Sequence, residues 1–340
     1  MINKTEHAIM KNWNNKSSIT ISITCVTYNQ ENYIRETLDS FLMQKTNFSF
    51  EILIHDDAST DRTQDILREY ENRFPTIIKA VYQKNNQFSK GINPMSFLFN
   101  KVKGKYIAFC DGDDYWSDEN KLQVQVEEME KYPNIDMSFH PSYKFVNGSI
   151  DNKYLAKHSN KSKIFTPSEI ILGGGEFCPT ASLMFRSRLI PKLPEWSKRI
   201  IPGDFPIQII GSYSGGGALY IDRVMSVYRV GAIGAWSNLS KDSSNIQEKR
   251  LLSFHNMLNM INRDFNNIFI DEVNEIIYKS SLGFIKRIAI DISQREEIFR
   301  MYKNIFPKKQ KLLWYLFYKN KNLHNLLSQI KHKLSRMMNR

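Results

Sequence analysis

The feature that most constrains the fold of this chain is a series of short apolar runs, rich in β-branched residues, at nearly equal intervals. The runs cover residues 19–26, 50–55, 77–82 and 106–110, so their starts lie 31, 27 and 29 residues apart. That interval is about the length of one βαβ unit. The spacing therefore predicts parallel strands that alternate with helices.

Helical periodicity fills the first intervals between these runs. After the first run, apolar residues recur at helical spacing at Ile34, Leu38, Phe41 and Leu42. The interval after the second run has the same periodicity, and Asp61 with Gln64 resembles a capping box at its start. Strands that alternate with helices favour an α/β fold with a mixed, mostly parallel sheet and flanking helices.

The remainder of the chain is less regular. A helix is predicted over residues 121–131 and a strand over 135–140. Residues 180–186 and 218–228 are expected to form a short strand pair or ribbon, and residues 247–302 have a helical pattern. We therefore divide the chain into four parts: a loose N-terminal arm (1–18), a main domain (19–240), a helical extension (241–305) and a basic amphipathic tail (306–340).

The net charge of +12 is concentrated in the tail. Residues 308–340 contain seven Lys and two Arg but no Asp or Glu, which leaves +3 for the first 307 residues. A nucleic-acid-binding domain would carry its charge on the body, together with a recognisable motif. We therefore expect no nucleic-acid partner.

Composition excludes several other classes of protein. The chain is 41% hydrophobic, which is too apolar for a disordered protein, and its 3 Cys lack the spacing of a disulfide scaffold. It has no apolar run of the roughly 18–20 residues that span a bilayer, and its first residues do not resemble a signal peptide. We expect a cytoplasmic protein that can also contact the inner face of the cell membrane.

Polar clusters follow the predicted strands where ligands bind in an open parallel sheet, at the carboxyl ends. They comprise residues 27–29, 55–61 and 111–116. Two carboxylates on either side of Gly112 can face one divalent cation, and that cation can bridge the oxygens of a diphosphate. Taken singly, each cluster has a structural alternative, because Asp111–Asp114 could be an acidic turn and Asp56-Asp57 a helix N-cap.

Other known ligand motifs fail on inspection. An EF-hand would need Gly and Glu where the chain has Trp116 and Leu122, and neither glycine cluster forms a phosphate-binding P-loop. The dinucleotide pattern G-x-G-x-x-G is also missing after the first strand.

The segments 21–29, 51–61 and 104–114 together resemble the family 2 glycosyltransferases of the Rossmann-like GT-A fold, over about residues 19–235. This resemblance implies an inverting transfer of a sugar from a nucleotide-diphosphate donor, with a UDP-sugar expected, that uses a divalent metal (Mn²⁺ or Mg²⁺). It also implies a saccharide or lipid-linked saccharide as the acceptor and a role in surface polysaccharide synthesis.

The resemblance also assigns roles to residues. Thr27, Tyr28, Asn29 and Asp57 would hold the nucleotide, with Asp57 accepting from the base, and Asp111 would lie near the ribose or diphosphate. Asp113 would be the principal metal ligand, helped by Asp114. Asp204 lies where the family has its (E/D)D motif, so it would be the base that deprotonates the acceptor, although a turn residue after Gly203 is the structural alternative.

Two departures from the family pattern concern the diphosphate. Tyr228-Arg229 is not followed by the His that family members often have, so Arg229 could neutralise phosphate charge instead. The loop after the third strand has Lys90 and Lys84 in place of an Arg, and a Lys acts as a point charge without bidentate contacts.

The amphipathic tail has two main interpretations. Its Trp, Tyr and Lys suit a membrane interface, because anionic headgroups attract each Lys by about 1 kcal/mol. A C-terminal helix that packs on the body is the alternative. For the chain as a whole, the rival functions are an inactive nucleotide-binding or membrane-associated scaffold and a sugar-nucleotide pyrophosphorylase, which usually has a Gly-rich loop after its first strand.

Overall fold

We describe the fold from a computed structural model, in which residues 4–199, 203–232, 243–287 and 289–318 are described. The chain divides into two compact units, Met1–Leu239 and Ser240–Arg340. Among the described residues, none of the helices combines the length and apolar character needed to cross a bilayer.

The first unit is built on an eight-stranded sheet with the order β3-β2-β1-β4-β10-β6-β11-β9. Its strands are β1 (Ile21–Thr27), β2 (Phe50–Asp56), β3 (Ile78–Tyr82), β4 (Tyr106–Phe109), β6 (Met137–Phe139), β9 (Lys163–Phe165), β10 (Met184–Arg186) and β11 (Ala218–Tyr220). β1 to β4 pair in parallel, whereas β9 and β10 run antiparallel to their neighbours. The predicted α/β class, the mixed sheet and its first strands are confirmed.

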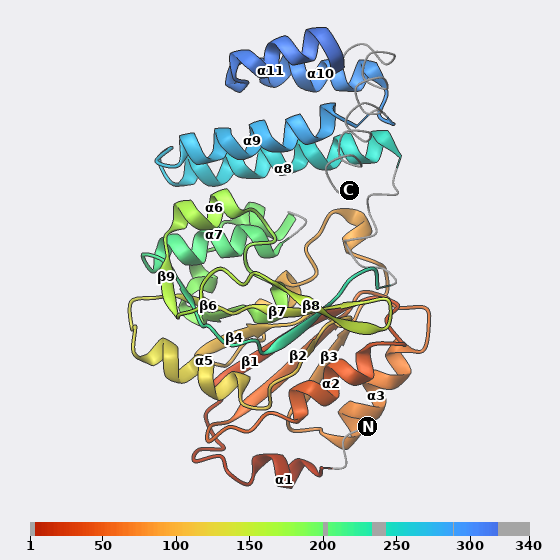
Figure 1. The fold of residues 1–340 in the computed structure, drawn as a ribbon. Coiled ribbons are helices and arrows are strands. Elements are labelled where there is room, and N and C mark those ends of the chain that lie inside the picture. Colours follow the sequence, from red (N-terminus) through yellow and green to blue (C-terminus); the bar gives the residue numbers. More distant parts are fainter. Residues whose placement is uncertain (1–3, 200–202, 233–242, 288, 319–340) are drawn as a thin grey trace, which may run out of the picture. The chain divides into compact units, whose positions relative to one another are not determined.

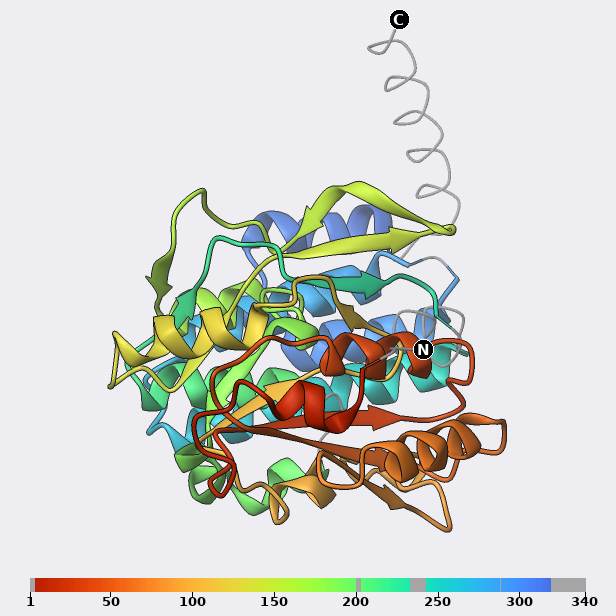
Figure 2. The same cartoon turned by 90° about the horizontal axis from the view of Figure 1, so that it is seen from below.

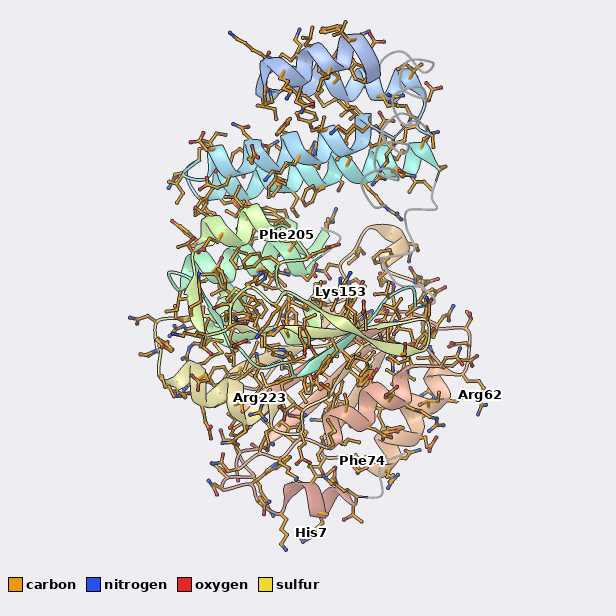
Figure 3. The ribbon with its side chains drawn as sticks, viewed as in Figure 1. His7, Arg62, Phe74, Lys153, Phe205 and Arg223 are labelled. Atoms are coloured by element: carbon orange, nitrogen blue, oxygen red, sulfur yellow. The ribbon has the colours of Figure 1, made fainter. Side chains whose placement is uncertain are left out.

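Helices cover both faces of this sheet. They are α2 (Ile34–Leu42), α3 (Thr63–Arg73), α4 (Ser96–Phe99), α5 (Lys121–Glu130), α6 (Pro167–Gly173) and α7 (Asp204–Ser214). α2, α3 and α5 lie on one side of the sheet, and α6 and α7 on the other (Figures 1 and 2). Phe74 at the end of α3 and Phe205 in α7 are fully buried, each on its own side (Figure 3).

A second sheet of four strands, in the order β5-β12-β7-β8, contains the strand that follows the acidic turn. These strands are β5 (Tyr115–Trp116), β7 (Ser142–Val146), β8 (Ser149–Leu155) and β12 (Ser226–Arg229). β5 pairs with β12, so the residues after Asp114 lie beside the residues before Arg229. This pairing brings two segments together that are far apart in the sequence.

The expected pairing of residues 180–186 with 218–228 is wrong. β10 and β11 lie on opposite edges of β6, and β12 leaves the large sheet altogether. β6 is fully buried along its length, so it needs a strand on each edge to satisfy its backbone groups. The local patterns could not show that a third strand lies between the two segments.

The N-terminal arm also differs from the loose segment that we expected. Residues Glu6–Met10 form helix α1, which Thr5 caps, and Ile9 and Trp13 are buried. The Trp13 ring lies 5.2 Å from the ring of Phe50, at the start of β2. These two apolar residues cover one end of the core, which fixes a segment that is otherwise polar.

The second unit is helical, as residues 247–302 predicted. It contains α8 (Ser244–Asp264), α9 (Ile270–Ile285), α10 (Ile292–Tyr302), α11 (Lys308–Leu313) and a π-helical turn (Trp314–Tyr318). Phe306 and Trp314 share a core with Phe284 and Phe299. The described start of the predicted tail is thus packed into the helical unit, and residues 319–340 lie outside the described part.

Candidate functional site

The polar clusters meet at one edge of the large sheet, where β1, β2 and β4 end. Thr27 and Asp56 are partners in the β1–β2 ladder. On the other side of β1, the backbone N–H groups of Cys110 and Gly112 donate to the carbonyls of Thr24 (3.2 Å) and Val26 (2.9 Å). The acidic turn is therefore fastened to β1, which lies where the strand order reverses and where open α/β sheets bind ligands.

Gly112 allows this close approach of the acidic turn. A Cβ at this position would lie 2.8 Å from Cβ of Thr27 and closer still to Oε1 of Gln30. The Thr27 hydroxyl donates to the same Gln30 oxygen at 2.7 Å. A side chain at residue 112 would push the turn away from β1, so the glycine sets the position of the carboxylates beside it.

The residues after β1 divide into loop-forming and accessible side chains. Thr27 is 1% exposed, whereas Tyr28 is 40% exposed. Asn29 has a positive φ of 51°, and its Oδ1 accepts from the backbone N–H of Thr60 at 2.7 Å. Thr27 and Asn29 therefore join this loop to its neighbours, and Tyr28 is the residue of the three whose side chain a ligand can reach.

Asp57, which we expected to contact the nucleobase, anchors the following loop in this structure. Its two carboxylate oxygens accept from the backbone N–H groups of Gln87 (2.8 Å) and Phe88 (3.0 Å), and the side chain is 1% exposed. Burial alone would raise the pKa of Asp57, but hydrogen bonds from His55, Phe88 and Gln87 outweigh it and hold the pKa low. Lys90 follows on the same loop and is exposed.

Asp56 is a residue for which the sequence predicted no ligand role. Its Oδ2 accepts from Gln64 Nε2 (2.6 Å) and the Ser59 N–H (3.1 Å), while its buried Oδ1 has no hydrogen-bond partner among the described residues. The predicted capping box of Asp61 and Gln64 is wrong, because the Gln64 side chain binds Asp56 and the N-cap of α3 is Arg62. The Oδ1 atom of Asp61 accepts from the Thr63 N–H. The sequence contains the adjacent pair Asp56-Asp57, but it does not show which of the two carboxylates binds the backbone of the following loop.

The acidic turn places three carboxylates close together in surroundings that disfavour charge. Asp111 is half-buried, and Asp113 and Asp114 are 9% and 3% exposed. Burial, followed by the charges of Asp113 and Asp204, raises the pKa of Asp111 well above its usual value. Burial also raises the pKa of Asp113 and of Asp114, against the opposing effect of Arg229. A cation bound at this turn would relieve the repulsion.

Arg229 is held beside the turn. Its backbone N–H donates to Oδ1 of Asp114 at 2.8 Å, and its guanidinium contacts the Asp113 carbonyl and the Glu36 carboxylate. Arg229 is 6% exposed. The structure therefore places its charge against protein groups, and the phosphate contact expected from the sequence stays a prediction.

Asp204, the expected base, begins α7 and comes to the same edge from the opposite side of the sheet. Its carboxylate accepts from the Thr180 hydroxyl (2.8 Å) and the Phe205 N–H (2.9 Å). Burial raises the pKa of Asp204, and these two hydrogen bonds partly oppose that effect. The charge of Asp204 also contributes to the raised pKa of Asp111, so the two half-buried carboxylates lie near each other.

The described residues do not contain a group of three or more His, Cys, Asp or Glu side chains arranged around one metal position. Asp111 and Asp113 nevertheless fit a metal that also binds a diphosphate. Mg²⁺ in phosphate sites usually has one or two protein carboxylates and takes its other ligands from phosphates and water. Asp114 fits less well, because its Oδ1 already accepts from Arg229.

A sequence model described as Glycosyl transferase family 2 matches residues 22–191, which is half of the chain. The chain belongs to glycosyl transferase family 2. This match confirms the resemblance seen in the sequence and covers the acidic turn of the family 2 domain. It ends before Asp204 and Arg229, so the roles of these two residues depend on the structure.

Similar proteins extend the family match along the sequence. Rv1520 of Mycobacterium tuberculosis is 32% identical over 232 residues, which cover 68% of this chain and 64% of that protein. The chain thus spans slightly less than two thirds of this relative. The UDP-Glc:alpha-D-GlcNAc-diphosphoundecaprenol beta-1,3-glucosyltransferase WfaP of Escherichia coli is 36% identical over 110 residues, 32% of this chain and 41% of WfaP.

Solved structures share the fold at low sequence identity. TarS of S. aureus, residues 1–349 in complex with UDP-GlcNAc, has a TM-score of 0.53 at 18% identity, covering 84% of this chain and 88% of that chain. The mannosyltransferase PcManGT of Pyrobaculum calidifontis, in complex with GDP-Man and Mn²⁺, has a TM-score of 0.54 at 13% identity, covering 91% and 85%. These likenesses confirm the GT-A fold of this family 2 member.

Proposed function

We propose that this family 2 member transfers a sugar from a UDP-sugar to a hydroxyl group of a saccharide or lipid-linked saccharide, with inversion, in surface polysaccharide synthesis. The observation that carries this proposal is that Asp204 lies near the acidic turn, at the edge of the sheet where β1 ends. One carboxylate can take a proton there, while the others lie where a diphosphate and its metal would bind.

Asp204 is the base in this scheme. Its carboxylate takes the proton of the acceptor hydroxyl while the hydroxyl oxygen attacks the anomeric carbon, and the bond from that carbon to the diphosphate oxygen breaks. The electron pair of the broken bond leaves with the nucleoside diphosphate. Because one displacement occurs on the face opposite the leaving group, the anomeric configuration inverts.

The acidic turn holds the donor's diphosphate end in this proposal. Asp113, with Asp111 or Asp114, would bind Mn²⁺ or Mg²⁺, which when bound stabilises the negative charge of the departing diphosphate. The repulsion around Asp111 supports a cation at this position. Lys90, exposed on the loop that Asp57 anchors, would approach the same diphosphate as a point charge.

Support for the donor comes from the exposed tyrosine and from similar folds. TarS was solved with UDP-GlcNAc. Tyr28 follows the end of β1 and is exposed, so its ring can stack on a nucleobase. A uridine at this end of the sheet would place its diphosphate toward the turn after β4, in line with the strand order.

The acceptor and the membrane contact are connected in this proposal. WfaP is named for an acceptor linked to diphosphoundecaprenol, which is a membrane lipid carrier. Leu312, Tyr315 and Leu316 are 59%, 62% and 49% exposed, and they lie among the Lys residues that begin the basic segment. We infer a peripheral contact with an anionic membrane through residues 308–340.

The first experiment is a thermal-shift panel of the full chain with UDP, GDP, CDP and dTDP, each with Mn²⁺ or with EDTA. A nucleotide at 100 times its dissociation constant should add about 2.7 kcal/mol of stability. A shift with UDP that needs Mn²⁺ supports both the donor and the metal. If no nucleotide shifts the melting temperature of a folded sample, the scaffold interpretation replaces the enzyme.

A further inference from the structure

The backbone of the acidic turn is held by side chains from outside the turn. The Thr37 hydroxyl, from α2, lies 3.0 Å from the carbonyl oxygen of Gly112 and 2.7 Å from that of Asp114. The carbonyl between them, that of Asp113, accepts from the guanidinium of Arg229. The single Thr37 hydrogen is shared between the carbonyls of Gly112 and Asp114, and Arg229 binds the carbonyl between them, so two side chains restrain the peptide planes around Asp113.

Arg229 is itself enclosed on several sides. Its guanidinium pairs with Glu36, which lies one residue before Thr37 on α2. The guanidinium carbon lies 4.6 Å from the ring centre of Tyr115, 5.3 Å from that of Tyr33 and 5.9 Å from that of Phe145. Stacking against aromatic rings and pairing with a carboxylate keep an Arg side chain in one orientation.

Arg229 also joins elements that are remote in the sequence. Arg229 lies on β12, and its backbone N–H donates to the Asp114 carboxylate. Its side chain contacts the Asp113 carbonyl and the Glu36 carboxylate on α2. Because its guanidinium already has these partners, Arg229 is suited to holding the turn in place and is poorly placed to bind a phosphate.

We infer that Arg229 is a positioning residue, which clamps the turn between α2 and β12 so that the Asp113 carboxylate is directed toward the metal of the donor complex. This role rests on the proposed function, since it concerns the same metal and diphosphate. It replaces direct phosphate contact by Arg229. Groups that orient a metal ligand are typically worth 10–100-fold in metal affinity or activity.

The test separates metal binding from nucleotide binding in the variant Arg229→Met. Mn²⁺ affinity is measured by electron paramagnetic resonance with saturating UDP, and UDP affinity is measured by calorimetry in EDTA. We expect the Mn²⁺ affinity to fall by roughly 10–100-fold and the UDP affinity in EDTA to stay at the wild-type value. Loss of UDP affinity in EDTA would instead make Arg229 a phosphate ligand and overturn the inference.

A second variant guards against a general loss of structure. Glu36 is half exposed, and Glu36→Gln keeps a hydrogen-bond acceptor for Arg229 while it removes the charge, so the protein should fold. We expect its Mn²⁺ affinity to fall, but less than in Arg229→Met, because the contact with the Asp113 carbonyl remains. The conservative variant Arg229→Lys should restore only part of the Mn²⁺ affinity, since its single ammonium nitrogen lacks the fork by which two guanidinium nitrogens reach the Asp113 carbonyl and Glu36.

Two further outcomes would also reject this role. If Arg229→Met lowered the melting temperature but left both affinities at the wild-type value, Arg229 would be a structural residue only. If wild-type protein bound no nucleotide, with or without Mn²⁺, the proposed function would fail, and with it the positioning role of Arg229. The second outcome is seen in the wild type alone, so the two failures can be told apart.

Discussion

The proton transfer that we propose depends on a single carboxylate, Asp204, which the fold keeps half-buried next to other carboxylates. Replacing it by Asn removes the base but preserves the size of the side chain and its hydrogen bond from the Phe205 N–H. We expect Asp204→Asn to lower the transfer rate by roughly 10²–10⁴-fold and to leave the UDP-induced thermal shift in place. A variant that transferred sugar at the wild-type rate would exclude Asp204 as the base.

The pH profile gives a second test of the same carboxylate. Asp204 must be ionised to accept a proton, so activity should rise with pH through a pKa that burial has raised. The Thr180 hydroxyl favours the ionised form through its 2.8 Å hydrogen bond. In Thr180→Val this bond is missing, so we expect the acid limb of the rate profile to move to higher pH, with an unchanged plateau. A shift to lower pH, or none, would contradict this assignment.

Asp57 is predicted to act on stability through the loop that it anchors. Asp57→Asn can accept from only one of the two N–H groups, and leaving the other buried and unpaired should cost about 1–3 kcal/mol at pH 7. The folded pKa of Asp57 is lowered, so its stabilisation is present above the unfolded pKa and is lost as the pH falls through the folded pKa.

Urea unfolding from pH 6 to pH 3 checks the prediction for Asp57, and the difference from wild type should shrink as the pH falls. The exposed Asp65 provides a control, because Asp65→Asn should change stability by less than about 0.5 kcal/mol. A constant difference over this pH range would mean that the carboxylate charge of Asp57 does not hold the loop.

At the scale of elements, the acidic turn works because it lies close against β1. Gly112→Ala would place a methyl group too near Thr27 and Gln30, so the turn must move. We expect this variant to fold and to lose the metal-dependent part of its UDP thermal shift. Gly283→Ala is a suitable control, since a Cβ in this helix meets nothing within 4 Å and should stabilise by roughly 0.5–1 kcal/mol. A normal shift in Gly112→Ala would show that the turn tolerates displacement.

The same scale shows which elements local patterns can predict. β1 to β4, with α2 and α3 between the first three of them, follow from β-branched runs and helical periodicity, since a strand buried on both faces is rich in apolar and β-branched residues. The capping box at Asp61 failed because Gln64 turns to Asp56, a neighbour in space. The expected strand pair failed because β6 lies between its members. Both errors concern contacts that the local sequence pattern does not encode.

At the scale of the whole molecule, the basic segment is predicted to bind anionic membranes. In Lys308→Gln/Lys309→Gln/Lys311→Gln, the loss of three charges should weaken binding to phosphatidylglycerol vesicles by about 3 kcal/mol, roughly 100-fold. In Leu312→Ser/Leu316→Ser, binding should also weaken, but without a change in its salt dependence.

Vesicle sedimentation of the full chain measures this binding, and phosphatidylcholine vesicles are the control. Equal binding to both lipids, or none by the wild type, would exclude the electrostatic contact. The structure limits which residues of this segment can be replaced without damage to the fold. Trp314 is buried, and its ring lies 4.9 Å from that of Phe299. Leu312 and Leu316 are therefore better targets than Trp314, whose loss would damage the core.

By itself, the sequence determined the α/β class and the edge of the sheet at which the acidic residues gather. These properties are local, because burial dictates the apolar runs and a parallel sheet brings the ends of its strands to one edge. The tertiary structure alone decided which side chains at that edge remain accessible. Asp57 and Arg229 already have backbone and carboxylate partners, while Asp204 lies near Asp111 and influences its charge. Sequence spacing could not show this, because the hydrogen bonds that commit a side chain join segments up to 193 residues apart.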